Sequence, residues 1–383
     1  MIEFYSGLDI ELKVAALVCV ACFLVQLFYV LRYVVIVKYR LSKRVNITDE
    51  QPPVSVVIPT ADDWDFIEKR LPVYLSQDYA NYEVVVVAND CSEDFVDVLN
   101  IMAEQNDRLK VTLIKKYNHS SHSNKLALTV GMKAAANELM LFTTSDSVPV
   151  SDQWLNLMSK GFTGSSIVLG YSGVERAKGL GNLYMRCSRL GVAMRWLVAA
   201  ISGRTYRGSC HSIGYTKNVY FESGGFTHLR LKHGVDDLFI QKVATDKNVS
   251  VVIHPQATIR QAAMPMKQWR KQRALNSFSF RYYPKGVKFS QAVELLSRLL
   301  LIVCWLFLVV KFVLAQQYVA VAVVTGVPFL RLLLLMILTY KTACRLGDKD
   351  LLWFYPIYDL LSPVSEMALA IRRRIKPSSQ LWI

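Results

Sequence analysis

Long apolar runs lie towards both ends of the chain, and shorter apolar runs alternate with polar stretches between them. The first long run covers about Val14 to Val37, and two more cover Leu295 to Ala315 and Tyr318 to Tyr340. Each is long enough to cross a lipid bilayer as one helix, which takes about 20 residues. Because only the polar pair Gln316-Gln317 separates the last two, the pattern predicts a helical hairpin that crosses the membrane and returns.

Charged residues beside these runs predict how they are oriented. Acidic residues precede the first run and basic residues follow it: Glu3, Asp9 and Glu11 before it, and Lys38, Arg40, Lys43 and Arg44 after it. Since basic residues favour the cytoplasmic side, the N-terminus is expected outside and the chain after residue 38 in the cytoplasm. A cleaved signal peptide would instead start with basic residues and have a shorter apolar core. The basic run Arg372-Arg373-Arg374 agrees with a C-terminal tail that returns to the cytoplasm.

The segment from Pro53 to about Lys288 has the pattern of a soluble α/β domain. Short β-branched runs predict strands at Val54–Ile58, Tyr82–Ala88, Val111–Ile114, Leu139–Thr143 and Ser166–Tyr171. Amphipathic stretches predict helices at Phe66–Ser76, Phe95–Asn106 and Asn124–Asn137. Continuous apolar strands that alternate with helices indicate a Rossmann-like, mostly parallel central sheet with helices on both faces. In such sheets the ligand binds at the carboxyl ends of the strands.

The last apolar stretch, Leu351–Ile371, differs from the three long runs because it contains Pro356, Asp359, Pro363 and Glu366. We expect it to lie at the membrane surface, or to enter the membrane and turn back, and not to form a fourth span. The pattern therefore divides the chain into four parts. These are a membrane helix with a basic flank at 1–45, a central domain at 46–290, a membrane hairpin at 291–342, and an interfacial segment with a basic tail at 343–383.

Composition adds two constraints on partners and compartment. The 383 residues carry a net charge of +15, which suits nucleic acid, anionic lipid or a phosphorylated substrate. The basic residues crowd beside the apolar runs and are not gathered with aromatic residues into a nucleic-acid motif. A membrane is therefore the favoured partner, and nucleic acid is not expected. The seven cysteines are scattered and lack the spacing of a zinc site, so we expect a reducing compartment and no structural disulfide.

Polar clusters follow three of the predicted strands, where a ligand is expected. They are Pro59-Thr60-Ala61-Asp62-Asp63, Asn89-Asp90-Cys91-Ser92-Glu93-Asp94 and Thr144-Ser145-Asp146-Ser147. The carboxylate of Asp90 suits hydrogen bonds with a base or a ribose. That of Asp146 is a hard oxygen ligand, which suits Mg²⁺ or Mn²⁺ on a diphosphate. Each cluster also has a simpler interpretation as a turn or a helix cap.

Charged residues farther along the chain complete the candidates. Lys125 opens a predicted helix, where the helix dipole favours anions, so it either meets a bound anion or is solvated. Asp236 and Asp237 precede an apolar helix. Paired carboxylates suit a general base, although the helix dipole alone also explains them. The stretch Arg270–Arg273 suits a clamp on a diphosphate or a basic helix on a membrane surface.

Taken in order over roughly Pro53 to Tyr283, these residues resemble the family 2 glycosyltransferases of the GT-A fold, of a membrane-anchored, bacterial type. Ser55-Val56-Val57-Ile58-Pro59 looks like the family's opening strand and turn. Asn89–Asp94 is similar to its nucleotide-binding Asp-Asp-x-Ser-x-Asp signature. Asn124-Lys125, followed by Ala127-Leu128 and Gly131, looks like its Lys-x-x-Ala-Leu-x-x-Gly stretch.

The second half of the segment continues the resemblance. Thr144-Ser145-Asp146 falls where the family's metal-binding Asp-x-Asp belongs. Gly208 to Tyr215, followed by Gly224-Gly225-Phe226, resembles its acceptor-side loop. Asp236-Asp237 falls where the catalytic base sits, and Gln272-Arg273 where a Gln-x-x-Arg-Trp motif begins.

The resemblance implies an inverting transfer of a sugar from a nucleotide-sugar, with UDP as the default carrier, to a lipid or lipid-linked glycan hydroxyl. The catalytic domain is expected at the cytoplasmic face of the inner (cytoplasmic) membrane. Asp236 would be the catalytic base, with Asp237 as the fallback, and Asp146 would hold Mg²⁺ or Mn²⁺. The residues expected to bind the nucleotide-sugar are Pro59, Ala61, Asp63, Asp90, Lys125, Ser145, Asp146, Arg270, Gln272 and Arg273.

Two departures from the family pattern keep alternatives open. Thr144 replaces the first aspartate of Asp-x-Asp, so Asp146 alone supplies a carboxylate there. The sequence after Gln272-Arg273 lacks the Arg-Trp pair, and few membrane helices are predicted, which argues against a processive cellulose- or hyaluronan-type synthase. The alternatives are a subunit of a polysaccharide synthase and a non-catalytic partner that binds a nucleotide-sugar without turnover.

Overall fold

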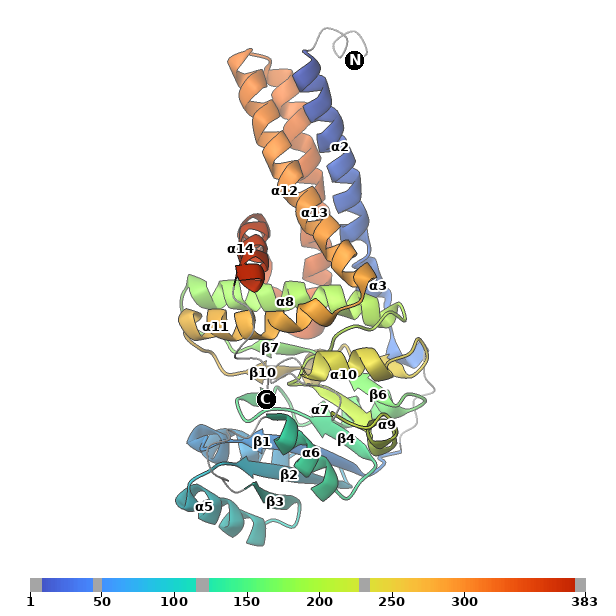
Figure 1. The fold of residues 1–383 in the computed structure, drawn as a ribbon, viewed down its shortest axis with the longest axis vertical. Helices are drawn as coiled ribbons and strands as arrows, with labels where there is room; N and C mark the ends of the chain where they lie inside the picture. Colours follow the sequence, from blue (N-terminus) through green and yellow to red (C-terminus); the bar gives the residue numbers. More distant parts are fainter. Residues whose placement is uncertain (1–8, 44–49, 115–123, 227–234, 376–383) are drawn as a thin grey trace.

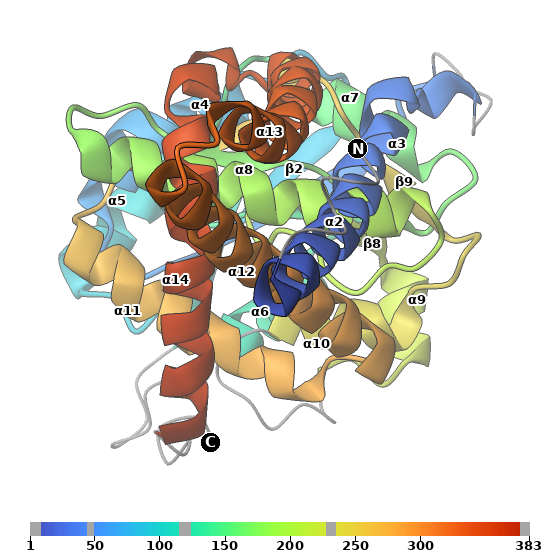
Figure 2. The ribbon, with the colours of Figure 1, turned by 90° about the horizontal axis from the view of Figure 1, so that it is seen from above.

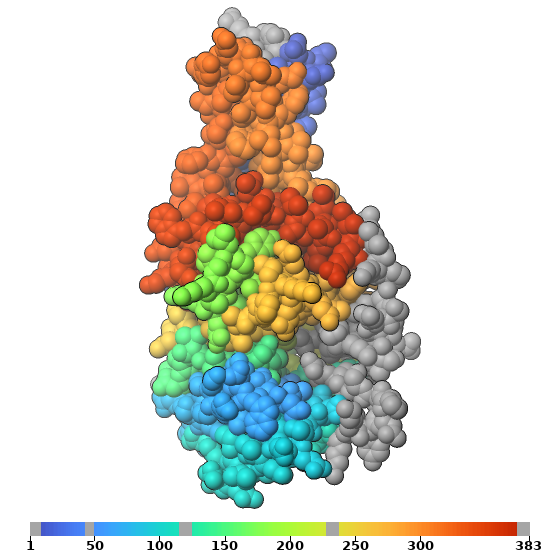
Figure 3. Space-filling view, turned by 90° about the vertical axis from the view of Figure 1, so that its left-hand side faces the viewer, coloured from blue at the N-terminus to red at the C-terminus, as the bar shows by residue number. Residues whose placement is uncertain are grey.

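The computed structural model describes residues 9–43, 50–114, 124–226 and 235–375. It has three layers, which Figure 1 shows one above another. A bundle of long helices forms the narrow upper layer, further helices lie across its base, and an α/β domain lies below them. The space-filling view in Figure 3 shows the narrow bundle widening towards the domain.

The α/β domain is built on a seven-stranded sheet in the order β3-β2-β1-β4-β8-β6-β9. Its strands are β1 Val54–Thr60, β2 Tyr82–Asn89, β3 Leu109–Ile114, β4 Leu139–Phe142, β6 Ile167–Leu169, β8 Ile213–Thr216 and β9 Val249–Val251. Neighbouring strands are parallel except at β8, which is antiparallel to both β4 and β6. The predicted mostly parallel sheet is therefore confirmed.

Close packing of helix α6 on the centre of the sheet explains why a glycine occurs in that helix. Strands β1 and β2 are buried along almost their whole length because helices cover both of their faces. A Cβ on Gly131 of α6 would lie 2.4 Å from Cγ1 of Val57 and 2.9 Å from Cγ2 of Val87. Only a residue without a side chain allows the helix to approach this closely.

Shorter helices and turns connect and cover the strands. The helices are α4 Leu71–Leu75, α5 Glu93–Glu104, α6 Asn124–Ala134, α7 Trp154–Ser159, α9 Lys217–Glu222 and α10 Val235–Val243. The short helical turns are η1 Leu41–Lys43, η2 Phe66–Arg70, η3 Lys160–Phe162, η4 Pro255–Ala257, η5 Ser277–Tyr282 and η6 Lys349–Trp353.

A second, three-stranded sheet lies between the main sheet and the membrane bundle (Figure 1). Its order is β5-β10-β7, and its strands are β5 Ser147–Pro149, β7 Ser172–Val174 and β10 Ile259–Gln261. Helices α8 (Leu180–Ile201) and α11 (Met266–Asn276) form the next layer towards the bundle. Helix α8 contacts β7, β9, α3, α11 and α14, so it joins the domain to the helices above it.

Three helices are long and apolar enough to cross a membrane. They are α2 Ile10–Leu31 with its continuation α3 Val34–Lys38, α12 Lys285–Leu314, and α13 Tyr318–Leu346. The first and second start earlier than the apolar runs predict, because polar residues at their starts continue the helices. Helices α12 and α13 lie side by side and are joined by a short turn at Ala315–Gln317.

Helix α14 (Tyr355–Ile375) lies across the base of the bundle, as the side view and the view from above both show (Figures 1 and 2). The turn before it is tied to the domain. Gly347 ends α13 with φ +75°, and the next residue, Asp348, is buried. The carboxylate of Asp348 lies 2.9 Å from Nη2 of Arg186 and 2.7 Å from Nη1 of Arg260, and accepts from Tyr171 at 2.7 Å. This clamp joins α13 to α8 and the small sheet.

Two predicted elements differ from the structure. The predicted helix Phe66–Ser76 is divided into the wide helical turn η2 and the short helix α4, because Pro72 has no N–H to continue the bonding of a regular helix. The predicted strand Ser166–Tyr171 ends at Leu169, and the chain then passes to the small sheet. At this crossing a Cβ on Gly170 would lie 2.2 Å from Oγ of Ser212.

Candidate active site

The polar clusters after β1 and β2 meet at one edge of the main sheet, because the carboxyl ends of parallel strands point the same way. Oδ1 of Asp62 accepts hydrogen bonds from the backbone N–H of Ser92 at 2.8 Å and from its hydroxyl at 3.0 Å. Asp62 and Asp90 both adopt positive φ, 42° and 61°, which aspartate tolerates better than most residues. The two loops therefore form one polar wall at the end of the sheet.

Asp63 connects this wall to the cluster after β4. Its carboxylate caps the following helical turn by accepting from the N–H of Phe66 at 3.1 Å. It also pairs with Arg70, whose Nη1 lies 3.3 Å from Oδ2 and donates to the carbonyl of Ser145 at 3.1 Å. Arg70 thus fixes the position of Ser145, next to Asp146, relative to the β1 loop. Ala61 is exposed on the β1 loop, and Pro59 is half-buried near the end of β1.

Asp146 is held by three side chains from three elements. Its Oδ1 accepts from the hydroxyl of Thr144 at 2.5 Å and from Ser147 at 3.2 Å. Its Oδ2 accepts from the amide of Gln261, on β10 of the small sheet, at 2.7 Å. About 40% of the Asp146 side-chain surface is exposed. A carboxylate has about four acceptor positions, so these bonds leave Oδ2 one position for a ligand.

His211 completes this group. Its Nδ1 lies 2.7 Å from Oγ1 of Thr144 and 3.7 Å from Oδ1 of Asp146. Burial lowers the pKa of His211 to about 4, so the imidazole is neutral at pH 7. Since the single hydroxyl proton of Thr144 is donated to Asp146, Nδ1 of His211 carries the proton that Thr144 accepts. Burial alone would raise the pKa of Asp146, but His211 and the hydrogen bonds from Thr144, Gln261 and Ser147 together lower it.

Asp237 lies in a separate, buried contact. Its Oδ2 accepts from the hydroxyl of Tyr283 at 2.5 Å, and its Oδ1 lies 3.5 Å from Nε of Arg207. Burial raises the pKa of Asp237, against the opposing effects of Arg207, Tyr283, Ser279 and the N–H of Gly208. Asp236 is in the first turn of α10, and its side chain lies outside the described part of the chain. Of the two predicted base residues, only Asp237 therefore has a described side chain.

A cavity of about 80 Å³ joins the surroundings of His211 to those of Asp237. Its polar lining comes from the small sheet, α8, the 207–211 loop, α10 and α11, and includes Ser172, Arg189, Ser209, His211, Asp237 and Gln272. Gln272, predicted to bind the donor, thus lies on the same cavity as His211. The cavity is adjacent to the Asp146 group through His211.

The remaining predicted binding residues are more scattered. Lys125 is half-buried on α6, and Arg270 is exposed on α11. Arg273 pairs with Glu366 of α14 at 3.0 Å, and its guanidinium lies 5.1 Å from the ring centroid of Trp269. Its charge is therefore directed to α14 in this structure, and a role on the diphosphate stays a prediction.

Sequence patterns did not single out Gln261, Arg189 or Arg70 as site residues. Gln261 ends a three-residue strand whose pairing with β5 and β7 depends on distant segments. Arg189 donates to Oε1 of Gln261 from the middle of α8 and has no local motif. His211 did carry a signal, because it lies inside the Gly208–Tyr215 stretch that resembles the acceptor-side loop.

Comparison with known proteins identifies the family of this chain. The model of the "Glycosyltransferase like family 2" matches residues 52–276, more than half of the chain. The chain therefore belongs to family 2 of the glycosyltransferases, and it is an enzyme of that class. The resemblance seen in the sequence is confirmed.

One known protein is similar to this chain in sequence, and another is similar in structure. GalNAc(5)-diNAcBac-PP-undecaprenol beta-1,3-glucosyltransferase of Campylobacter jejuni is 28% identical over 141 residues, which are 37% of this chain and 44% of that protein. The chain thus matches less than half of that relative's length. The mannosyltransferase PcManGT of Pyrobaculum calidifontis, solved in complex with GDP-Man and Mn²⁺, has a TM-score of 0.54 and 18% identity, covering 92% of this chain and 99% of its own. At that identity the likeness shows the fold alone.

Proposed function

We propose that this chain transfers a sugar from a nucleotide-sugar, with UDP-sugars as the first donors to test, to a hydroxyl of a lipid or lipid-linked glycan. The observation that carries the proposal is the Asp146 group at the carboxyl edge of the sheet. Its partly exposed carboxylate adjoins the polar wall formed by the β1 and β2 loops. The cavity beside His211 leads from this group towards α10.

The donor would lie along this edge. Ala61, Asp63 and Asp90 belong to the two loops that form the polar wall, and Pro59 lies near the end of β1. A base and a ribose fit there because the loops offer carboxylates and backbone groups as hydrogen-bond partners. Ser145 and Asp146 would then face the diphosphate.

The residues around Asp146 fit a divalent cation that is shared with a diphosphate. No group of three or more His, Cys, Asp or Glu side chains that could hold a metal occurs among the described residues. Mg²⁺, however, is commonly bound by one or two carboxylates together with substrate phosphates and water. Asp146 keeps one free acceptor position on Oδ2 for this purpose. A bound Mg²⁺ or Mn²⁺ would neutralise charge on the departing nucleoside diphosphate.

Asp236 would accept the proton of the attacking hydroxyl, as its place in the family pattern implies. Asp237 is less suited because Tyr283 and Arg207 already occupy its carboxylate. Thr144, Ser147 and Gln261 would keep Asp146 in one orientation, so that little reorganisation is needed during transfer.

Two observations support a lipid-linked acceptor at the cytoplasmic membrane face. The relative from Campylobacter jejuni is named for an acceptor linked through a diphosphate to undecaprenol. Three helices of this chain are long and apolar enough to cross a membrane, and they rise directly above the domain. The basic residues after the first helix favour a cytoplasmic domain at the inner membrane.

The test is release of nucleoside diphosphate by the detergent-purified full chain. A panel of nucleotide-sugars is offered with Mg²⁺ or Mn²⁺ and native membrane lipids as acceptor. We expect one donor to be consumed, and Asp236→Asn to lower the rate by about 100- to 10,000-fold, the range for loss of a general base. Asp97→Asn, at an exposed position on α5, is the control. Nucleotide binding without turnover of any donor would favour the non-catalytic partner instead.

A further inference from the structure

A large cavity lies where the membrane helices meet the helices across their base. It has a volume of about 570 Å³ and is lined by residues of α2, α8, α12, α13 and α14 and of the segment from Phe278 to Tyr282. We call it the junction cavity. Its volume falls within the roughly 300–1,000 Å³ typical of small-molecule sites. Apolar side chains such as Val30, Leu295 and Leu335 line its bundle side.

The junction cavity carries an excess of positive charge. Six cationic side chains and three carboxylates line it: Arg195, Arg281, Lys288, Arg298, Arg331 and Arg373, with Glu294, Asp359 and Glu366. Three positive charges therefore remain after the carboxylates are balanced. Such an excess next to a membrane suits an anionic group.

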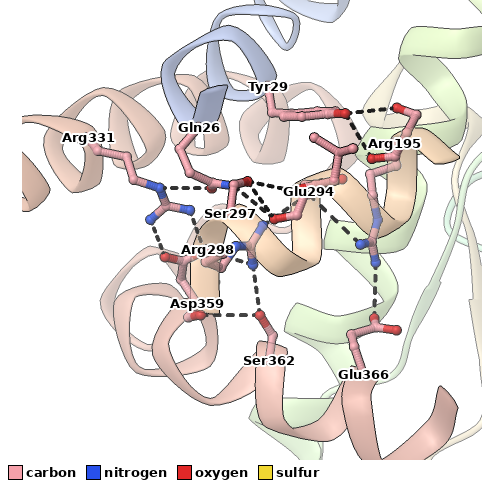
Figure 4. A network of polar contacts seen from close by, with 12 residues as sticks. Gln26, Tyr29, Arg195, Glu294, Ser297, Arg298, Arg331, Asp359, Ser362 and Glu366 are labelled. Atoms are coloured by element: carbon pink, nitrogen blue, oxygen red, sulfur yellow. Dashed lines mark hydrogen bonds and ion pairs between the residues drawn. The ribbon is translucent and has the colours of Figure 1, made fainter. Parts of the chain in front are cut away.

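Three of the six cations form ion pairs with the carboxylates of the cavity. Figure 4 shows the polar network on the cavity wall. Arg331 pairs with Asp359 at 2.5 Å, and Arg298 lies between Asp359 and Glu294 at 3.2 and 3.0 Å. These residues belong to α12, α13 and α14, so their ion pairs join the three helices along one side of the cavity.

A second ion pair marks the side nearer the domain. Arg195 of α8 pairs with Glu366 of α14 at 3.1 Å, and Arg273 of α11 shares the same carboxylate oxygen. All three carboxylates of the cavity are therefore neutralised by arginines that hold helices together.

The other three cations form no ion pair with a carboxylate among the described residues, and they lie close together. Lys288 donates through Nζ to the carbonyl of Arg281 at 3.1 Å. The guanidinium of Arg373 lies 4.3 Å from the ring centroid of Phe280, the neighbour of Arg281 in the chain. The excess charge is thus concentrated at one place, formed by the η5 segment, the start of α12 and the end of α14.

The junction cavity continues towards the candidate active site. A second cavity, of about 150 Å³, shares Arg195, Glu366 and Arg373 with it. That second cavity shares Arg207 and Gln272 with the small cavity at His211 and Asp237. A row of three adjoining cavities therefore leads from the membrane helices to the Asp146 group.

We propose that the junction cavity binds the phosphate-bearing head of a membrane lipid, with Arg281, Lys288 and Arg373 contacting the phosphate oxygens. The lipid tail then lies along the bundle, and the group attached to the phosphate points along the row of cavities. Arginine and lysine are well suited to phosphate oxygens, since charge-assisted hydrogen bonds are among the strongest in proteins. The assignment rests on the proposed function, because it makes this lipid the acceptor.

Binding of a short-chain isoprenyl diphosphate to the full chain in nanodiscs tests the proposal directly. The variants Lys288→Gln, Arg373→Gln and their combination are compared with Lys285→Gln and Arg372→Gln, which are exposed neighbours that do not line the cavity. We expect roughly a tenfold weaker affinity for each cavity charge removed, the effect of losing one strong hydrogen bond to a charged group. The control variants are expected to bind as the unchanged chain does. Unchanged affinity in the double variant overturns the proposal.

Further measurements distinguish a lipid phosphate from free pyrophosphate. They also distinguish failure of the lipid site from failure of the proposed transfer function. Inorganic pyrophosphate that competes as well as the isoprenyl diphosphate contradicts a lipid site. If a glycerophospholipid binds but the KM for lipid acceptor is unchanged in the double variant, the cavity holds a structural lipid and the acceptor assignment is wrong. Donor hydrolysis without acceptor is expected to be equal in the unchanged chain and in the control variants Lys285→Gln and Arg372→Gln. If the unchanged chain hydrolyses no donor, the transfer function fails, while the binding arm still decides the cavity.

Discussion

The side-chain amide of Gln261 donates to Oδ2 of Asp146 at 2.7 Å, and its carbonyl accepts from Arg189. A residue of the small sheet thus fixes the carboxylate at the edge of the main sheet. Gln261 is fully buried, so its amide has no water to exchange for these partners. The orientation of Asp146 therefore depends on how the two sheets pack.

Gln261→Leu tests this relationship. The change leaves Oδ2 of Asp146 and the guanidinium of Arg189 without their partner. We expect the affinity for nucleoside diphosphate in the presence of Mg²⁺ or Mn²⁺ to fall about 10- to 100-fold, the usual effect of removing a residue that orients a metal ligand. Titration calorimetry measures it. Gln105→Leu, at the exposed position that directly follows α5, is the control, and equal losses in both variants would contradict the interpretation.

Asp237→Asn is expected to reduce stability more than chemistry. The change removes the charge that faces Arg207, while the hydroxyl of Tyr283 can still donate to the new side chain. We expect the free energy of unfolding to fall by about 1–3 kcal/mol, the cost of leaving a buried polar group poorly paired. Thermal unfolding in detergent measures it, beside Asp97→Asn. A full loss of transfer with unchanged stability would identify Asp237 as the base in place of Asp236.

Gly131→Ala is expected to destabilise the domain through the contact between α6 and the sheet. The added methyl would lie 2.4 Å from Cγ1 of Val57, and overpacking of this kind costs about 1–3 kcal/mol. Gly286→Ala is the matched control, since a Cβ there meets nothing within 4 Å and alanine favours a helix. Differential scanning fluorimetry should show a lower Tm for the first variant only.

The pairing of Glu366 predicts a loss of stability in acid. Burial would raise the pKa of Glu366, but Arg195 and Arg273 lower it below its ordinary value. A carboxyl group with a lowered pKa stabilises the folded state above its unfolded pKa of about 4.3, and this stabilisation is lost as the pH falls below that value. The Tm of the unchanged chain should therefore decrease more between pH 5 and pH 3 than that of Glu366→Gln. Parallel pH profiles would show that the two arginines do not act through Glu366.

Much of the fold could be predicted because its signals are local. The strands at Val54 and Tyr82 are continuous β-branched runs, and the three membrane helices are long apolar runs. The polar clusters after β1, β2 and β4 were placed correctly at one edge, since parallel strands end together.

The second half of the site could not be predicted in the same way. Strand β8 is antiparallel, and β5, β7 and β10 have three residues each, too few for a periodic pattern. Their pairing brings Gln261 to Asp146 across 115 positions of sequence. No local rule contains such a contact, because it arises only when the two sheets pack.

The contacts of Asp348 have a consequence for the distance between the membrane helices and the candidate active site. Arg186, Arg260 and Tyr171 hold the end of α13 on the domain through Asp348. The clamp would thereby keep the distance from the bilayer to the Asp146 group constant. Under the proposed function, an acceptor anchored in the bilayer would present to the enzyme only those hydroxyls that lie at one depth. The clamp would thus select which hydroxyl forms the new linkage, according to the distance of that hydroxyl from the membrane.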